Sequence, residues 1–357
     1  MNIRYPIYEG VYRILTFYQP KLFNYGTKTY ISKIFDISLC KKSIMQQLPI
    51  HFAPLQGYTE AFYRNAHAAV FGGIDTYYTP FVRIEKESFR NKDIREIDFA
   101  NNHVPHLVPQ LIAPSAEKAE TILSLFIEKG YGEADINLGC PFPILAKRHN
   151  GSGILPYPEE VKTLLGIVVK YPQIRFSVKM RLGWENPEEC LAIAPLLNDL
   201  PLRQVTMHPR LGKQQYKGDV DLEGFAAFQS VCKHPLIYNG DIKRREDILR
   251  IQEQFPMLAG VMIGRGLLAN PALALEYKEN RTLSADEMRN KLYSMHTSVY
   301  SQYAAQLEGG EGQLLNKMKT FWEYLAPEAD RKLLKAIHKS GTFQKYNQAV
   351  LSFFGQR

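Results

Sequence analysis

The stretch Asp135-Ile136-Asn137-Leu138-Gly139-Cys140-Pro141 is an apolar strand that stops at a lone thiol between glycine and proline. Gly139 permits a tight backbone turn and Pro141 fixes the next φ, so the Cys140 side chain would be held at a strand end instead of packed in the core. Polar groups at the carboxyl ends of parallel strands form the active-site rim of α/β barrels. A thiol placed there can act as a positioned acid.

Seven further strand-like runs alternate with helical segments along the chain. The eight predicted strands cover residues 50–54, 74–80, 106–112, 134–138, 175–182, 204–208, 235–239 and 258–263. The spacing predicts helices over 115–129, 158–170 and 187–199, among others. Eight such units indicate an α/β protein with a (β/α)8 TIM barrel. A doubly wound open sheet gives the same alternation, but polar or glycine-rich residues end nearly every strand, which favours the barrel.

After about residue 279 the pattern becomes helical only. Helices are expected over 285–305, capped by Ser284, and over 313–325, 331–338 and 343–354. We therefore expect a barrel domain over 45–278 and an appended all-helical domain over 279–357. Residues 1–44 are expected to be a mis-assigned start or a loosely attached extension; a basic, tyrosine-rich RNA-binding arm is the alternative.

Composition restricts the class of protein further. The chain has 357 residues, 45% of them apolar, and a net charge of +8. No stretch approaches the roughly 18 uninterrupted apolar residues of a membrane helix, and no signal-peptide pattern is present, so we expect a cytoplasmic protein without membrane contact. Cys40, Cys140, Cys190 and Cys232 are widely spaced, which predicts free thiols and no metal site.

The predicted strand ends carry six motifs in a characteristic order. They are Ala53-Pro54-Leu55-Gln56-Gly57; Asn137-Leu138-Gly139-Cys140-Pro141 followed by Gly151-Ser152-Gly153; Ser177 to Trp184; His208-Pro209-Arg210 leading to Gln215-Tyr216-Lys217-Gly218; Asn239-Gly240-Asp241; and Met262 to Gly266. In this order they resemble the tRNA-dihydrouridine synthase family, flavoenzymes that reduce uridine in RNA. The resemblance extends from about residue 50 to the C-terminus and is most specific in the barrel.

The resemblance implies flavin mononucleotide (FMN) as cofactor. Independently of it, Gly264-Arg265-Gly266 and Asn239-Gly240-Asp241 follow the last two strands, where barrels commonly bind phosphate. Tight turns, a structural ion pair for Lys179 and a core position for His208 are the alternatives. The predicted cofactor-binding residues are Pro54, Leu55, Gln56, Gln110, Lys179, His208, Asn239, Gly240, Asp241, Gly264 and Arg265. NADPH or NADH would be the reductant, and no dinucleotide fingerprint is present or needed.

In the resembled reaction, hydride reaches carbon 6 of uracil and Cys140 protonates carbon 5. A free thiol has an ordinary pKa near 8.5 and is protonated at neutral pH, although burial as an apolar residue is its commonest role. The predicted substrate contacts are Asn137, Lys147, Arg148, Arg181 and Arg210. Exposed cations on the tail, among them Lys317, Lys319 and Arg331, either contact RNA or are only solvated.

The sequence departs from the family pattern in two places. Phe142-Pro143-Ile144 stands where lysine is expected, and Pro209 follows His208 where glycine is usual. These differences affect the RNA side more than the flavin side. Two other functions remain open: a flavin barrel acting on a free pyrimidine, similar to dihydroorotate dehydrogenase, and a catalytically silent RNA-binding barrel. We expect a monomer that binds tRNA or ribosomal RNA.

Overall fold

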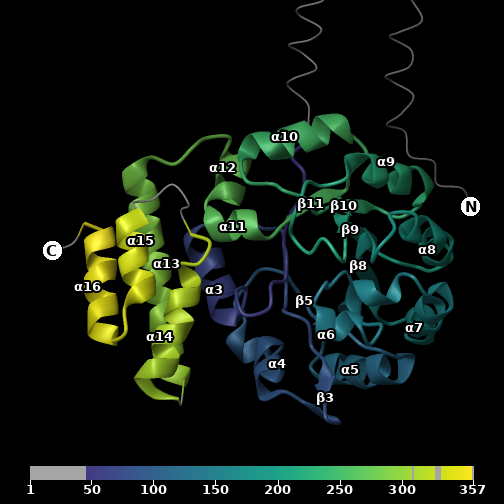
Figure 1. Cartoon of the computed structure of the whole chain (residues 1–357), viewed down its shortest axis with the longest axis horizontal. Helices are drawn as coiled ribbons and strands as arrows, with labels where there is room; N and C mark the ends of the chain where they lie inside the picture. The colour runs from purple at the N-terminus through teal and green to yellow at the C-terminus, as the bar shows by residue number, and fades with distance from the viewer. Residues whose placement is uncertain (1–45, 308, 326–330, 356–357) are drawn as a thin grey trace, which may run out of the picture. The chain divides into compact units, whose positions relative to one another are not determined.

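The computed structural model describes residues 46–307, 309–325 and 331–355. Leu48–Arg357 form one compact unit, in which a barrel of parallel strands is flanked by helices (Figure 1). The predicted extension over residues 1–44, including Cys40, lies outside the described residues.

The barrel contains the eight predicted strands. They are β1 (Ile50–Phe52), β2 (Thr76–Tyr78), a strand in two parts, β5 (Leu107–Val108) and β6 (Gln110–Leu111), β7 (Glu133–Leu138), β8 (Arg175–Gly183), β9 (Gln204–Leu211), β10 (Leu236–Tyr238) and β11 (Gly260–Ile263). All neighbours pair in parallel, in the order β5-β2-β1-β11-β10-β9-β8-β7-β6. The predicted TIM barrel is confirmed.

Pro109 explains why one predicted strand appears as two. Because proline has no backbone N–H, it cannot donate a hydrogen bond to a neighbouring strand, and the strand is interrupted between β5 and β6. Its carbonyl oxygen still accepts a hydrogen bond of 2.9 Å from the Asp135 N–H. β5 pairs with β2 and β6 with β7, so the two ends of the sheet are consecutive pieces of chain and the barrel closes at Pro109.

Helices follow the strands as the sequence predicts. They are α3 (Ala61–Val70), α4 (Asn91–Glu96), α5 (Ala116–Glu128), α7 (Pro158–Lys170), α8 (Glu189–Asn198), α9 (Leu222–Val231), α10 (Arg245–Gln254), α11 (Arg265–Ala269) and α12 (Leu273–Glu279). The Ser115 hydroxyl caps α5 by accepting a hydrogen bond from the Lys118 N–H, and Pro158 occupies the first turn of α7.

Short elements fill the loops between strands. A hairpin of β3 (Ile84–Glu85) and β4 (Ser88–Phe89) and the 3-10 turn η1 (Phe99–Asn101) follow β2, while α6 (Pro143–Ala146) and the 3-10 turn η2 (Gly151–Ile154) follow β7. The last two therefore lie directly after the Cys140 motif.

The tail consists of α13 (Ala285–Gln306), α14 (Gly310–Phe321), α15 (Arg331–Lys339) and α16 (Phe343–Phe353). Ser284 and Glu287 form a capping box at the start of α13. The aromatic core of the tail includes a buried phenol, that of Tyr346, which contacts His296 Nε2 at 2.7 Å and accepts a 2.8 Å hydrogen bond from Trp322 Nε1. These bonds satisfy the polar atoms of an otherwise apolar core.

The tail is fastened to the barrel beside α3 (Figure 1). Glu60, directly before α3, accepts hydrogen bonds from Tyr303 Oη at 2.8 Å and from Lys317 Nζ at 2.6 and 2.7 Å. Apolar residues of the tail also belong to the same continuous core as the outer face of the barrel. No helix among the described residues has the length and apolar character needed to cross a membrane.

Candidate active site

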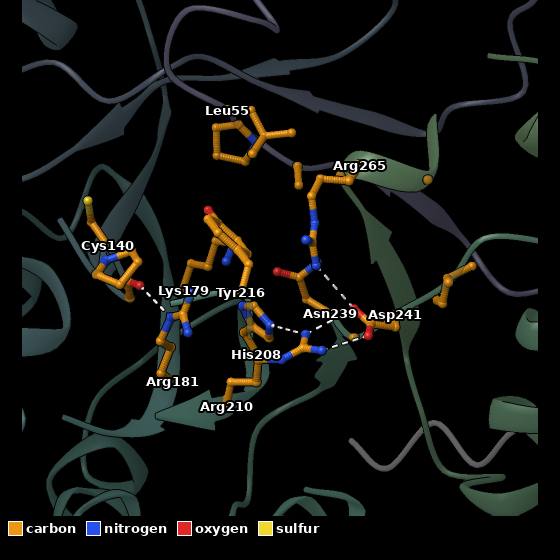
Figure 2. A pocket seen from close by; sticks show the side chains of 18 of the residues that line it. Leu55, Cys140, Lys179, Arg181, His208, Arg210, Tyr216, Asn239, Asp241 and Arg265 are labelled. Atoms are coloured by element: carbon orange, nitrogen blue, oxygen red, sulfur yellow. Dashed lines mark hydrogen bonds and ion pairs between the residues drawn. The ribbon is translucent and has the colours of Figure 1, made fainter. Parts of the chain in front are cut away.

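A cavity of about 780 Å³ opens at the carboxyl ends of the barrel strands, a size typical of small-molecule and cofactor sites. Cys140 lies on one side of it and Arg265 with Asp241 on the other, with Lys179 and Tyr216 between them (Figure 2). The cavity wall thus combines a thiol, several cations and the glycine-rich ends of the last two strands.

Asn137 sets the turn that carries Cys140. Its Oδ1 accepts hydrogen bonds from the backbone N–H groups of Gly139 at 2.9 Å and Cys140 at 2.8 Å. Asn137 Nδ2 donates to Gln110 Oε1 at 2.8 Å, and Gln110 Nε2 donates to the buried carboxylate of Asp135 at 2.7 Å. Because a carboxylate only accepts and a backbone N–H only donates, the two ends of this chain fix the orientation of both amides.

The turn η2 packs directly against the Cys140 backbone. The Cys140 carbonyl oxygen accepts hydrogen bonds from both Ser152 N and Ser152 Oγ at 3.0 Å. Gly151 has a φ of +60°, and a methyl group on it would lie 2.6 Å from the Cys140 oxygen and 2.8 Å from its Cβ. A methyl group on Gly153 would collide with the backbone of Ala146. The Gly151-Ser152-Gly153 motif therefore buttresses the thiol-bearing loop.

The Cys140 thiol is half-buried and lines the cavity. Burial raises its pKa above the ordinary value of a thiol, although the backbone N–H of Phe142 and the charges of Arg181 and Lys179 act in the opposite direction. The neutral, proton-bearing form therefore predominates at neutral pH. Cys140 can donate a proton without a partner base.

Lys179 presents an ammonium group to the cavity. It pairs in register with Asn137 of the neighbouring strand, so both side chains are on the inner face of the barrel. Burial and the charge of Arg181 lower the Lys179 pKa to about 8, while the Asp135 carboxylate partly compensates. No residue of the described chain forms a hydrogen bond or ion pair with Lys179 Nζ. The ammonium group is therefore available to an anionic ligand.

His208 is a neutral donor beside Lys179. Burial, followed by the charges of Arg181 and Lys179, lowers its pKa well below the ordinary range. Its Nε2 lies 3.2 Å from the Nη1 of Arg210, and since a guanidinium only donates, Nε2 is the acceptor nitrogen. The proton of the neutral ring is then on Nδ1, which has no partner among the described residues.

Two buried arginines hold the loops around the cavity together. Arg181 donates to the carbonyl oxygens of Gly139 at 2.9 Å, Leu211 at 2.9 Å and Gln215 at 2.7 Å. Arg210 forms a double contact with the Asp241 carboxylate, at 2.9 and 2.6 Å. Both side chains are only 1% exposed, so they tie loops together within the protein.

The carboxyl ends of β10 and β11 meet at a part of the cavity that is suited to bind an anion. Arg265 Nη2 approaches the Asp241 carboxylate at 3.3 Å, and the charge of Arg210 together with its hydrogen bond holds the Asp241 pKa below its ordinary value. A methyl group on Gly266 would collide with the Ile242 carbonyl oxygen, so glycine is required for the two strand ends to meet. Within the described chain, the N–H groups of Gly240 and Gly264 have no acceptor.

A family model identifies the family to which this chain belongs. The model described as dihydrouridine synthase (Dus) matches residues 51–352, which includes both barrel and tail. The chain belongs to the dihydrouridine synthase family. It is therefore an enzyme, an oxidoreductase of a flavin-dependent family.

Individual dihydrouridine synthases are related at moderate identity. tRNA-dihydrouridine synthase B of Vibrio cholerae is 28% identical over 249 residues, 68% of this chain and 68% of that protein. tRNA-dihydrouridine(16) synthase of Pseudomonas syringae pv. tomato is 31% identical and aligns with 64% of this chain and 74% of its own length. An old yellow enzyme homologue from Zymomonas mobilis has a TM-score of 0.48 at 14% identity, covering 66% of this chain and 90% of its own.

Most residues predicted for a dihydrouridine synthase site line the cavity. These are Pro54, Leu55, Gln56, Asn137, Cys140, Lys179, Arg181, His208, Arg210, Asn239, Gly240, Asp241, Gly264 and Arg265. Gln110 differs because it is fully buried and both functions of its amide are engaged by Asp135 and Asn137. Lys147 and Arg148 are exposed on the segment between α6 and η2 and do not line this cavity.

Several cavity residues were not among the predicted contacts, including Tyr216, Glu323 and Tyr324. The Tyr216 ring lies between the guanidinium groups of Arg265 and Arg181, whose carbons are 4.6 and 5.4 Å from its centroid. Glu323 and Tyr324 reach the cavity from the residues after α14. The Gln215-Tyr216-Lys217-Gly218 motif gave a signal for Tyr216, whereas nothing local marks the two tail residues.

The remaining described cysteines are free thiols away from this site, Cys190 within α8 and Cys232 at the end of α9. Over the described ranges, no group of histidine, cysteine and carboxylate side chains is arranged to hold a metal ion.

Proposed function

We propose that this protein reduces the C5–C6 double bond of uridine in tRNA to dihydrouridine, with FMN as cofactor, NADPH or NADH as reductant and Cys140 as proton donor. The observation that carries the proposal is the placement of a protonated thiol and an unpaired ammonium, Lys179, in one cavity at the barrel mouth. The names of the relatives, tRNA-dihydrouridine synthases, support tRNA as the substrate.

The residues present fit FMN. Lys179 offers a cation to a ring that becomes anionic on reduction, and His208 offers a neutral N–H. Gln56 Oε1 is buried without a partner among the described residues, so it can accept a hydrogen bond from a ring N–H. The N–H groups of Gly240 and Gly264, beside Arg265, would hold the phosphate. Pro54 and Leu55 form an apolar wall.

The reduced flavin, when bound, supplies a hydride to carbon 6 of the uracil. The protein's own part is to deliver a proton to carbon 5, and the Cys140 Sγ–H supplies it. Burial favours the protonated thiol beforehand, and the thiolate that results is stabilised by the charges of Arg181 and Lys179. One hydride and one proton are thus added across the double bond, and a solvent proton restores the thiol.

The RNA must present an unstacked base to this cavity, so loops that are already open are preferred. Lys147 and Arg148 are exposed and have no ion-pair partner in the described chain, so they can contact the phosphate backbone. On the tail, Lys317 and Lys319 are engaged with Glu60 and the Ser340 carbonyl. Arg331, Lys335 and Lys339 are exposed and are the stronger candidates there.

The test compares the wild-type protein with Cys140→Ala. We expect the purified wild type to be yellow and to reduce an unmodified tRNA transcript, seen as a two-dalton mass increase at uridine. Cys140→Ala should lose about 10²- to 10⁴-fold in rate and keep its flavin absorbance. Reduction of free uracil or orotate in place of RNA would favour the free-pyrimidine function. A colourless protein that binds no flavin, or full activity in Cys140→Ala, would refute the proposal.

A further inference from the structure

A second hollow lies near the thiol-bearing loop. It has a volume of about 460 Å³, and its wall shares no residue with the main cavity. The lining residues are Ala146, Lys147, His149, Gly153, Pro156, Tyr157, Trp184, Glu185 and Glu189. They come from α6 with the segment after it, from η2 to the start of α7, and from the end of β8 to the start of α8.

The turn η2 connects this hollow with Cys140. Gly153 lines the hollow, while the preceding Ser152 donates two hydrogen bonds to the Cys140 carbonyl oxygen. On the other side, a methyl group on Gly212 would lie 2.6 Å from Ser152 Oγ and would collide with the Trp184 ring. Trp184, Gly212 and Ser152 are therefore packed together, and the hollow is one turn of chain away from the proton donor.

The hollow offers aromatic faces. The rings of Tyr157 and His149 are stacked, with centroids 3.9 Å apart and planes inclined by 14°, and Tyr157 is 42% exposed. Trp184 is half-buried, and its indole N–H has no hydrogen-bond partner among the described residues. Flat aromatic side chains with an unused donor are the features that proteins use to stack on and orient a nucleobase.

The hollow is lined by one lysine and two glutamates, and a third glutamate, Glu160, contacts His149 Nδ1 at 2.8 Å. Its acidic side chains are already engaged: the Glu189 carboxylate accepts hydrogen bonds from the backbone N–H groups of Trp184 and Asn186, and Glu185 pairs with Lys213 at 2.5 Å. Lys147 on the wall and the adjacent Arg148 are exposed and have no ion-pair partner within the described residues. Cations beside an aromatic pocket would contact the phosphates that flank a bound base.

We propose that this hollow binds a second base of the RNA, one displaced from the stack near the uridine that enters the main cavity. The inference rests on the proposed function, because it gives the same RNA a second point of attachment. Stacking on Tyr157 and Trp184 would hold the displaced base. The contact would orient the strand relative to Cys140, since η2 is the common support of both sites.

The first experiment measures the affinity of an unmodified tRNA transcript that the wild-type enzyme reduces. Tyr157→Leu should weaken binding about tenfold, the scale of one lost stacking contact, and Tyr157→Phe should retain the affinity. Tyr171→Leu, at the opposite end of α7, is the matched control and should bind as the wild type does. Flavin content should be the same in all four proteins, which separates a lost RNA contact from a folding defect.

Transcripts with a single abasic site near the target uridine locate the contact. One abasic position should weaken binding to the wild type and cause no further loss in Tyr157→Leu. Equal affinity of Tyr157→Leu and wild type for every transcript would overturn the inference and leave the proposed function intact. A wild-type protein that neither binds nor reduces any tRNA would remove the proposed function and the second site together.

Tryptophan fluorescence provides an independent readout. The chain has two tryptophans, and Trp322 is 1% exposed and hydrogen-bonded within the tail core. Quenching by acrylamide therefore reports mainly on Trp184. Bound tRNA should protect Trp184 from acrylamide, and unchanged quenching at saturating tRNA would contradict the proposal.

Discussion

Asn137 holds Cys140 in place through the backbone, because its Oδ1 accepts hydrogen bonds from the N–H groups of Gly139 and Cys140 at 2.9 and 2.8 Å. The amide of Asn137 is itself oriented by Gln110, which donates to the buried Asp135 carboxylate. The position of the thiol thus depends on a carboxylate deep in the barrel. The role of the loop in positioning the thiol can therefore be tested by substitutions that leave Cys140 itself unchanged.

We expect Asn137→Ala to lower the rate of uridine reduction about 100-fold, because the thiol loop loses both hydrogen bonds that fix its turn. Single-turnover kinetics with pre-reduced enzyme measures this step. Ser152→Ala is the control: Cys140 would lose one hydrogen bond to its carbonyl oxygen but keep the one from the Ser152 N–H, so its rate should fall less than tenfold. Wild-type rates in Asn137→Ala would contradict the positioning role.

From the lowered pKa of Lys179 we expect the affinity of the protein for reduced flavin to depend on pH. Its pKa of about 8 in the flavin-free protein means that the ammonium is charged below this pH and neutral above it. Because the charged form attracts the anionic ring, affinity should fall as the pH rises through about 8. Titration of reduced flavin into the apoprotein between pH 6 and about 9.5 measures this effect. Lys179→Met should bind weakly at every pH, whereas Lys213→Met should follow the wild type.

Gly151→Ala should destabilise the protein and impair catalysis. The substitution places a side chain at a φ of +60° and within 2.6 Å of the Cys140 oxygen, for which we expect a cost of about 1–3 kcal/mol. Urea denaturation and the turnover rate are the measurements. Gly166→Ala is a control of opposite sign, because that glycine lies inside α7 with nothing within 4 Å of the added methyl. It should gain about 0.5–1 kcal/mol.

Glu133, at the amino end of β7, is hydrogen-bonded to His106 and forms ion pairs with Arg203 and Arg175. Burial raises its pKa, but the hydrogen bond with His106 and the charges of Arg203 and Arg175 outweigh burial and hold the pKa below its ordinary value. Glu133→Gln should therefore lose about 1–3 kcal/mol of unfolding free energy at pH 7. The proposed flavin site lies at the other end of the strands, so activity should persist.

The pH dependence of that loss follows from the sign of the shift. A carboxyl group with a depressed folded-state pKa stabilises the protein above its unfolded pKa of about 4.3 and ceases to do so as the pH falls through the lower folded value. The difference between wild type and Glu133→Gln should thus vanish in strong acid. Urea denaturation at pH 7 and at about pH 3 tests this sign. An equal difference at both pH values would show that charge is not the cause.

The sequence allowed the barrel to be predicted because eight strand-like runs alternate with helical segments and nearly every run ends in polar or glycine-rich residues. The predicted strand over 204–208 nevertheless ends too early: β9 continues to Leu211, past Pro209. Proline usually ends a ladder. Here Pro209 lies at an irregularity in the pairing of β9 with β8, and the pairing resumes between Leu211 and Gly183, so the strand continues past the proline.

The sequence was a better guide to which residues line the candidate site than to what each of them does there. Arg181 and Arg210 were predicted to contact RNA because positive side chains must hold the phosphate backbone. In the structure both are buried, and carbonyl oxygens from distant loops or the Asp241 carboxylate use their donors. The role of Gln110 was equally hidden in the sequence, because its amide forms hydrogen bonds with residues that strand register brings beside it. Sequence order marks a rim position, but it does not show which groups remain available to a ligand.

Glu323 and Tyr324 belong to the tail yet form part of the cavity wall, and the Tyr324 ring packs edge-on against Tyr58, 5.1 Å between centroids. A chimera that joins this barrel to the helices of another family member would therefore replace part of the cavity wall along with the tail. Grafting the tail to redirect RNA choice should alter catalysis at the same time, unless residues 323 and 324 are carried over with the barrel.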